Sequence, residues 1–153
     1  MTTTTTDAQA ADAMRAHHFE MATTLRQRVT DLRTAVRSGR PHAEAQRSVL
    51  EYLENELLPH AMAEERALYP AGDAGSTAML VRSMRDEHLN LIGHVDAFRD
   101  ATDPVDAVAL SAAIFALFDS HLHKENDLLV PALLSAPGVS LADLLGGMHE
   151  LLG

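Results

Sequence analysis

Histidine and glutamate residues recur in this sequence at spacings that suit metal binding. The chain has nine histidines in 153 residues. Two segments share one pattern, a histidine followed by glutamate four positions later and by proline ten positions later: His60, Glu64 and Pro70, and His121, Glu125 and Pro131. Two more histidines share another, with methionine and arginine at equal distances before them: Met14, Arg15 and His18, and Met84, Arg85 and His88. An internal repeat marks positions that do equivalent work. The candidate metal ligands are therefore His18, His60, Glu64, His88, His121 and Glu125.

These side chains predict a transition-metal site inside a helical core. Residues four apart lie on one face of a helix, so each His-x-x-x-Glu pair points in one direction. Burying six ionisable groups in an apolar core is costly unless a cation compensates. Four imidazoles and two carboxylates fit a dinuclear iron or manganese site, whereas calcium and magnesium prefer more oxygen ligands. The sequence has neither the Glu-x-x-His pattern of ferritin-like bundles nor the His-Glu-x-x-His pattern of zinc proteases.

The order of these residues resembles the hemerythrin-like family, also called the HHE cation-binding domain. The family pattern is His, His-x-x-x-Glu, His, His-x-x-x-Glu. Four segments carry it here: His18, Leu58-Pro59-His60 to Tyr69-Pro70, Glu87-His88, and His121 to Val130-Pro131. The resemblance covers nearly all of the helical part. It implies a non-haem di-iron centre, oxo- or hydroxo-bridged, in a four-helix bundle, with Glu64 and Glu125 bridging the ions; manganese is the alternative metal.

One departure from the oxygen-carrying hemerythrins bears on function. Those proteins place a second histidine four residues from the first on the third helix, but Met84 and Ile92 stand at these distances from His88. Two octahedral irons need about twelve bonds. The four histidines, the two bridging carboxylates and the oxo or hydroxo bridge then leave about two coordination positions open. We expect a protein that binds or reacts with peroxide, O2 or NO in stress protection or sensing. A peroxidase-like or catalase-like activity stays open, and the alternative is an iron-binding, storage or metal-sensing module that acts through a protein partner.

The neighbours of these ligands have two interpretations. Tyr69 and Glu65 are candidates for an additional ligand or an outer partner of the metals. The preferred interpretation is structural for both: Tyr69 as a partly buried aromatic at the bundle end, and Glu65 as a solvated neighbour. His17 and His123 fall on other helix faces, so we expect both to face solvent. The pair His123 and Asp127 has ligand spacing but lacks an apolar seam.

Composition excludes several other classes of function. With 22 acidic and 12 basic side chains, the formal charge of −10 disfavours nucleic acids and acidic membranes. The absence of cysteine removes disulfides and thiolate chemistry. No uninterrupted apolar run approaches the length of a membrane span, and residues 1–13 lack the basic and apolar regions of a signal peptide. We therefore expect a cytoplasmic protein without a nucleic-acid or membrane partner.

Helical periodicity predicts the elements that position these residues. Apolar side chains recur at helical spacing in four long segments, joined by short polar turns that contain glycine or proline. The segments are 12–37, 42–69, 76–101 and 104–135. The predicted fold is an all-α, up-down-up-down four-helix bundle over 12–135, after a flexible N-terminal lead over 1–11. Residues 136–153 contain a short amphipathic helix that packs on the bundle or on a partner, and 140–152 is the candidate surface for a homodimer or partner contact.

Overall fold

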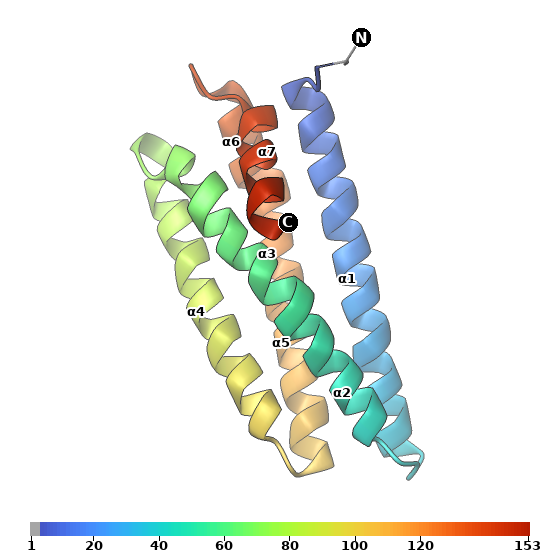
Figure 1. Ribbon diagram of the computed structural model, residues 1–153. Helices are drawn as coiled ribbons and strands as arrows, with labels where there is room; N and C mark the ends of the chain where they lie inside the picture. Colours follow the sequence, from blue (N-terminus) through green and yellow to red (C-terminus); the bar gives the residue numbers. More distant parts are fainter. Residues whose placement is uncertain (1–3) are drawn as a thin grey trace.

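The protein is a bundle of four long helical segments with a short helix at the C-terminus (Figure 1). The computed structural model describes residues 4–153, and within this range all regular structure is helical. Residues 1–3 of the predicted lead lie outside it. The helices are α1 (Asp7–Arg37), α2 (Ala43–Tyr52), α3 (Leu58–Ala63), α4 (Ala78–Asp100), α5 (Pro104–Lys124), α6 (Val130–Ser135) and α7 (Leu141–Leu152). The predicted fold class is confirmed.

The first helix begins at Asp7, earlier than the sequence analysis predicts. Thr6 and Gln9 form a capping box, in which each side chain accepts a hydrogen bond from the backbone N–H of the other residue. Such a box satisfies N–H groups that a helix start otherwise leaves without partners. Ala10 is buried as well, so packing supports this added turn. The part of the predicted lead after Thr6 is therefore helical.

Three π-helical turns keep the second and fourth segments continuous: Leu53–Leu57, Glu64–Leu68 and Glu125–Leu129. In each, the residue just before a proline donates its N–H to the carbonyl five positions back: Leu58 to Leu53, Tyr69 to Glu64, and Val130 to Glu125. Proline lacks an N–H and collides with the carbonyl four residues earlier in an α-helix. The wider turn accommodates that proline. Two of the three turns start at the glutamates of the repeat, and π turns are frequent at functional sites.

Two apolar clusters fill the interior, one toward each end of the bundle. The first lies toward the α1–α2 and α4–α5 turns and includes Leu25, Leu53, Phe98 and Ile114. The second lies toward the chain termini and includes Met14, Val81, Leu133 and Leu141. Along α1 and α4, the sequence passes from one cluster to the other at His18 and His88 respectively. The candidate ligands thus form a polar layer between two apolar ones.

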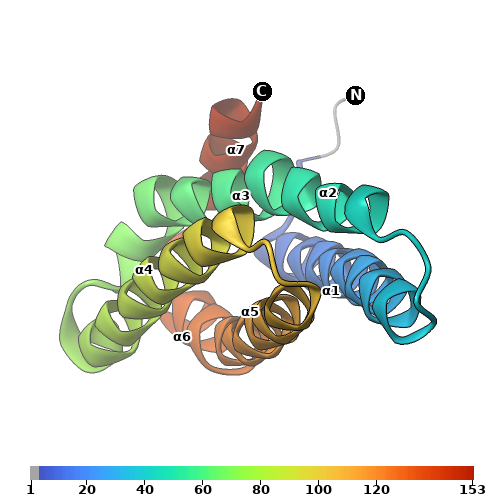
Figure 2. The same cartoon turned by 90° about the horizontal axis from the view of Figure 1, so that it is seen from below.

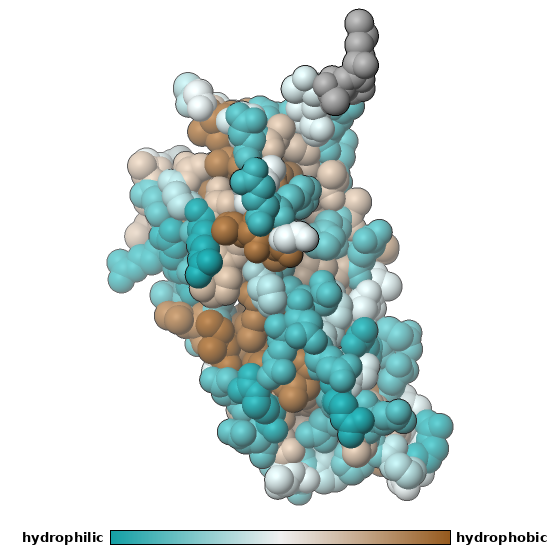
Figure 3. Space-filling model, viewed as in Figure 1, coloured by the Kyte–Doolittle hydropathy of each residue, from teal (hydrophilic) through white to brown (hydrophobic). Residues whose placement is uncertain are grey.

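The C-terminal helix α7 lies against α1, α3 and the π turn that follows α3 (Figures 1 and 2). Asp7 Oδ1 accepts hydrogen bonds from Ser140 Oγ at 3.1 Å and from Ala142 N at 2.9 Å, which joins the two ends of the chain. The last turn stays on the surface, where Leu151 and Leu152 are 50% and 44% exposed. On the face shown in Figure 3, hydrophobic side chains gather around this helix.

By length and composition alone, the helical segment Pro104–Ser135 could cross a membrane. Core helices of soluble proteins pass the same test, and this segment packs against α1 and α4 in the bundle. Its buried face also carries His121 and Glu125. The expectation that no membrane is involved stays a prediction.

Candidate metal centre

All six side chains selected by the repeat meet in the polar layer of the bundle. Each is at most 5% exposed. The helices contribute His18 from α1, His60 from α3, His88 from α4 and His121 from α5, and two π turns contribute Glu64 and Glu125. Four separate segments therefore converge on one buried site.

The six residues form two groups of donor atoms that share Glu64. The first group is His18, His60, Glu64 and Glu125, and the second is Glu64, His88 and His121. Within each group, one donor atom from each residue lies within 4.8 Å of the others. Two buried groups that could each hold a metal ion thus lie side by side.

Each carboxylate presents one oxygen to each group. Glu64 Oε1 lies 2.5 Å from His60 Nε2, while its Oε2 lies 3.6 Å from His121 Nε2. Glu125 Oε1 lies 3.5 Å from His18 Nε2, and its Oε2 lies 3.3 Å from His121 Nε2. A carboxylate that divides its oxygens in this way is suited to bridge two cations.

Several buried polar atoms of the first group make no hydrogen bond of suitable geometry within the described part of the chain: His18 Nε2, both ring nitrogens of His60, and Glu125 Oε1. This holds for His60 Nε2 even though Glu64 Oε1 lies 2.5 Å away. Buried polar groups without partners are rare, because each costs its desolvation energy. A cation bound to the Nε2 and carboxylate atoms would compensate that cost. Imidazole and carboxylate donors also suit divalent transition metals. The residues therefore fit a dinuclear metal centre.

The protonation of the metal-free site is uneven. Burial lowers the pKa of His18 to about 4. Burial and the nearby Glu64 carboxylate raise the pKa of Glu125 to about 8. For His121, burial acts to lower the pKa, but the hydrogen bonds with Glu125 and Glu64 raise it to about 9. Because metal ligands must be deprotonated, metal binding would release the protons that His121 and Glu125 retain.

Three of the four histidines donate their Nδ1–H to an outer partner. His88 donates to Glu65 Oε1 at 2.8 Å, His121 to Glu87 Oε2 at 2.7 Å and His18 to Asn126 Oδ1 at 2.7 Å. Glu87 also pairs with Lys124. Such partners fix the orientation of the imidazole and raise its basicity. The preferred interpretation of Glu65 as a solvated neighbour is thus wrong, and Glu87 and Asn126 are further outer partners that are absent from the predicted site.

Tyr69 lies inside the site. Its side chain is fully buried, and its hydroxyl donates to Glu64 Oε2 at 2.8 Å. The Tyr69 hydroxyl oxygen is also 3.0 Å from His121 Nε2 and 3.3 Å from Glu125 Oε2. Burial and the two carboxylates raise the pKa of Tyr69 above its usual range, so the hydroxyl stays protonated in the metal-free protein. The preferred interpretation of a partly buried aromatic at the bundle end is therefore wrong.

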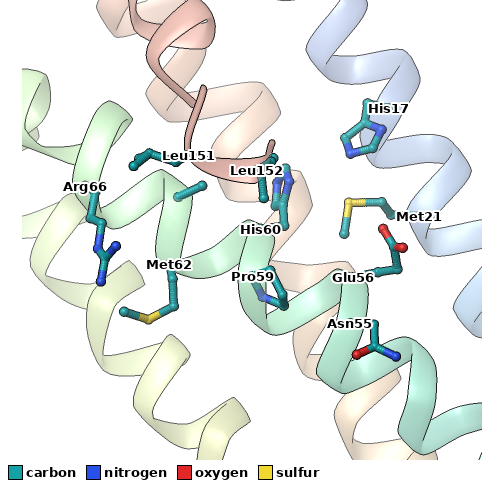
Figure 4. Close-up of a pocket in the computed structure, with 11 residues that line it drawn as sticks. His17, Met21, Asn55, Glu56, Pro59, His60, Met62, Arg66, Leu151 and Leu152 are labelled. Atoms are coloured by element: carbon teal, nitrogen blue, oxygen red, sulfur yellow. The ribbon is translucent and has the colours of Figure 1, made fainter. Parts of the chain in front are cut away.

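The other histidines lie outside the two groups. His123 is 70% exposed, as predicted, and Asp127 is exposed as well. His17 is also exposed, but its ring centroid lies 5.4 Å from that of His60. It lines a cavity of about 420 Å³ between α1, α3 and α7, together with His60 and Leu152 (Figure 4). The site therefore approaches the surface at His60.

Comparison with known proteins gives one match. The Hemerythrin HHE cation binding domain matches residues 9–133, a range that contains all six candidate ligands and ends before α7. Neither a curated protein nor a solved structure matches the chain. With this match over most of its length, the chain belongs to the hemerythrin HHE cation-binding domain family.

Proposed function

We propose that the protein holds two iron ions and uses them to bind or react with small oxidants, peroxide, O2 or NO, in stress protection or sensing. The observation that carries the proposal is the carboxylate pair, because Glu64 and Glu125 each direct one oxygen to each group of ligands. Manganese is the second candidate metal, since it accepts the same donors. We also propose a cytoplasmic location without a nucleic-acid or membrane partner, and the formal charge of −10 supports the absence of such partners.

The chain supplies the holding groups, and iron would supply the redox chemistry. His18 and His60 would hold one ion and His88 and His121 the other, with both carboxylates shared. Glu65 and Glu87 would orient the second pair of histidines by accepting their Nδ1–H groups. The buried Tyr69 hydroxyl adds a further ligand, or a proton donor, within reach of Glu64 and His121.

The ligand inventory favours a small exogenous molecule as the reaction partner. Met84 is fully buried one helical turn before His88, where the oxygen carriers can place another histidine. Four histidines and two bridging carboxylates leave coordination positions open on two six-coordinate ions. The cavity beside His60 supports access from the surface to the first group.

Elemental analysis tests the metal. The untagged protein from iron-sufficient cells should contain about two irons per chain. The variant His123→Ala, at an exposed site, should keep them, whereas His60→Ala should lose metal. A folded, metal-free protein that also refuses added ferrous iron would overturn the proposal.

Turnover tests the chemistry. The reduced protein is mixed under anaerobic conditions with excess peroxide or NO, and consumption is followed in equivalents per chain. Consumption of many equivalents supports oxidant handling. A stable oxygenated spectrum that reverses under vacuum would instead identify a reversible carrier and overturn this part of the proposal.

A metal-dependent binding module is the second candidate function. The last turn of α7 exposes Leu151 and Leu152, and this helix lies outside the family match. In that case, residues 140–152 would contact a partner or a second copy, and metal would change the oligomeric state without turnover. Sedimentation of the metal-loaded and chelator-treated protein distinguishes the two candidates.

A further inference from the structure

The repeat places residues 17 and 87 in equivalent positions. Each precedes the first histidine of its own helical hairpin, His18 or His88. Glu87 reaches across to the second helix of its hairpin, where it accepts the Nδ1–H of His121. His17 likewise faces the second helix of its own hairpin, with its ring 5.4 Å from that of His60. The same place beside the second histidine thus holds a carboxylate in one hairpin and an imidazole in the other.

This difference leaves His60 without support. Its Nδ1 is buried and has no hydrogen-bond partner within the described residues. The second group has a carboxylate on the Nδ1 of both His88 and His121, whereas the first has only the neutral amide of Asn126, on His18. Loss of an outer partner of a metal-bound histidine typically lowers metal affinity 10- to 100-fold.

The group that contains His60 lies beside cavities, and access from solvent affects how fast a bound ion exchanges. His17 and His60 together line the cavity of about 420 Å³ (Figure 4). They also line a smaller cavity of about 170 Å³ beside α7. His60 therefore lies between its buried group and space that opens toward the surface. An ion at this group has a short route to solvent.

We propose that the two ions of the centre are held unequally: the ion at His18 and His60 exchanges first, and residue 17 sets how firmly it is held. This inference rests on the proposed function, because it requires two bound ions. Position 17 acts only through His60, and the histidine there leaves the Nδ1 of that ligand without a hydrogen-bond partner. A carboxylate in its place would accept the Nδ1–H of His60, fix that imidazole and retain the ion longer.

Cobalt(II) is a suitable probe, because its visible absorption reports its ligands. The full chain is loaded with two cobalt ions and mixed with excess chelator. The wild-type protein should release cobalt in two steps of one ion each. His17→Glu should slow the fast step by about tenfold or more, and leave the slow step unchanged. His17→Gln is the neutral control, because glutamine has nearly the same shape as glutamate, and it should slow the fast step far less.

The reciprocal variant acts on the other group. Glu87→Gln weakens the partner of His121 and should accelerate the slow step without changing the fast one. Far-ultraviolet circular dichroism confirms that each variant is folded. Release of both ions in a single step, or an unchanged fast step in His17→Glu, would overturn this inference alone. A chain that takes up no divalent metal would overturn the proposed function as well.

Discussion

The two helical hairpins of the bundle contribute the same ligands to the centre. The first hairpin consists of α1 with α2 and α3, and the second of α4 with α5 and α6. Each provides one histidine from its first helix and a His-x-x-x-Glu pair from its second. Each glutamate begins a π turn that ends two residues before a proline. The repeat thus determines both the ligand types and the backbone that carries them.

The surroundings of the ligands differ between the hairpins. Five positions after the glutamate, the first hairpin has Tyr69 and the second has Val130. The residue before the first histidine is His17 in one hairpin and Glu87 in the other. Among the described elements, α7 packs mainly against the first hairpin, on α1, α3 and the π turn that follows α3. Equal ligands in unequal surroundings therefore predict two ions with different properties.

The strongest test of a shared centre removes one bridging carboxylate. Glu64→Ala takes away the residue common to both groups, so both ions should be lost even though only the first hairpin is changed. We expect metal affinity to fall by at least about 100-fold, since loss of an outer partner alone costs 10- to 100-fold. Metal content per chain and calorimetric titration measure it. The control is His123→Ala, and retention of one tightly held ion in Glu64→Ala would contradict a shared centre.

The pH dependence of the metal-free protein should reveal the uneven protonation of its candidate ligands. The pKa of His121 is raised from 6.5 to about 9 and that of Glu125 from 4.5 to about 8. The folded protein therefore holds these protons more tightly than the unfolded chain, and the stabilisation that this gives is lost as the pH rises through the raised values. The pKa of His18 is lowered to about 4, so its effect instead reduces stability as the pH falls below 6.5. Between pH 6.5 and 9, the free energy of unfolding should fall, by up to roughly 1.4 kcal/mol per pH unit for each proton.

Urea unfolding of chelator-treated protein at pH 6.5 and pH 9 measures this change. Metal-loaded protein provides the comparison, because ligand deprotonation favours metal binding as the pH rises. Its stability should therefore decline less than that of the metal-free protein. A metal-free protein that is more stable at pH 9 than at pH 6.5 would contradict the assigned protonation of His121 and Glu125.

The sequence predicts the helices and the six converging side chains because both depend on periodic patterns. Apolar spacing places each helix face toward the core, and the histidines lie in line with those faces. Burial of every one of the six, at 5% exposure or less, agrees with that placement. The outer partners are harder to predict because Asn126 reaches His18 across 108 positions of sequence. A signal does exist: Glu65 and Asn126 each follow a repeat glutamate, and each contacts the first-helix histidine of the opposite hairpin.

Other features depend on contacts between the chain ends. The early start of α1 involves Thr6 and Gln9, whose capping pattern is readable from the sequence, but also the contact of Asp7 with Ser140, 133 positions away. The position of Tyr69 depends on the π turn before Pro70. With 100° per residue, ideal helical geometry would turn Tyr69 away from the face of Glu64, so the sequence pattern alone does not place its hydroxyl among the ligands.

A smaller effect should follow from the tyrosine that distinguishes the hairpins. Tyr69→Phe removes a hydroxyl that lies 2.8 Å from Glu64 Oε2 and 3.0 Å from His121 Nε2. We expect the variant to keep two ions but to bind them about tenfold less tightly, as for loss of an outer partner. Tyr52→Phe is the matched control, because the Tyr52 hydroxyl binds the carbonyl of Met21 instead. Equal affinity in Tyr69→Phe and wild type would show that the hydroxyl does not support the metals.

The smallest effect should come from the helix that covers only the first hairpin. Asp7→Ala removes the acceptor of the two hydrogen bonds from Ser140 Oγ and Ala142 N at the start of α7. We expect the free energy of unfolding to fall by about 1 kcal/mol, the usual net value of such bonds, with metal content unchanged. Asp12→Ala is the control, since Asp12 is exposed and pairs with Arg15 of the same helix. Amide exchange should quicken in α7 and not in α4, because α7 packs mainly against the first hairpin. Equal protection of α7 in both variants would mean that its apolar face, and not Asp7, holds it in place.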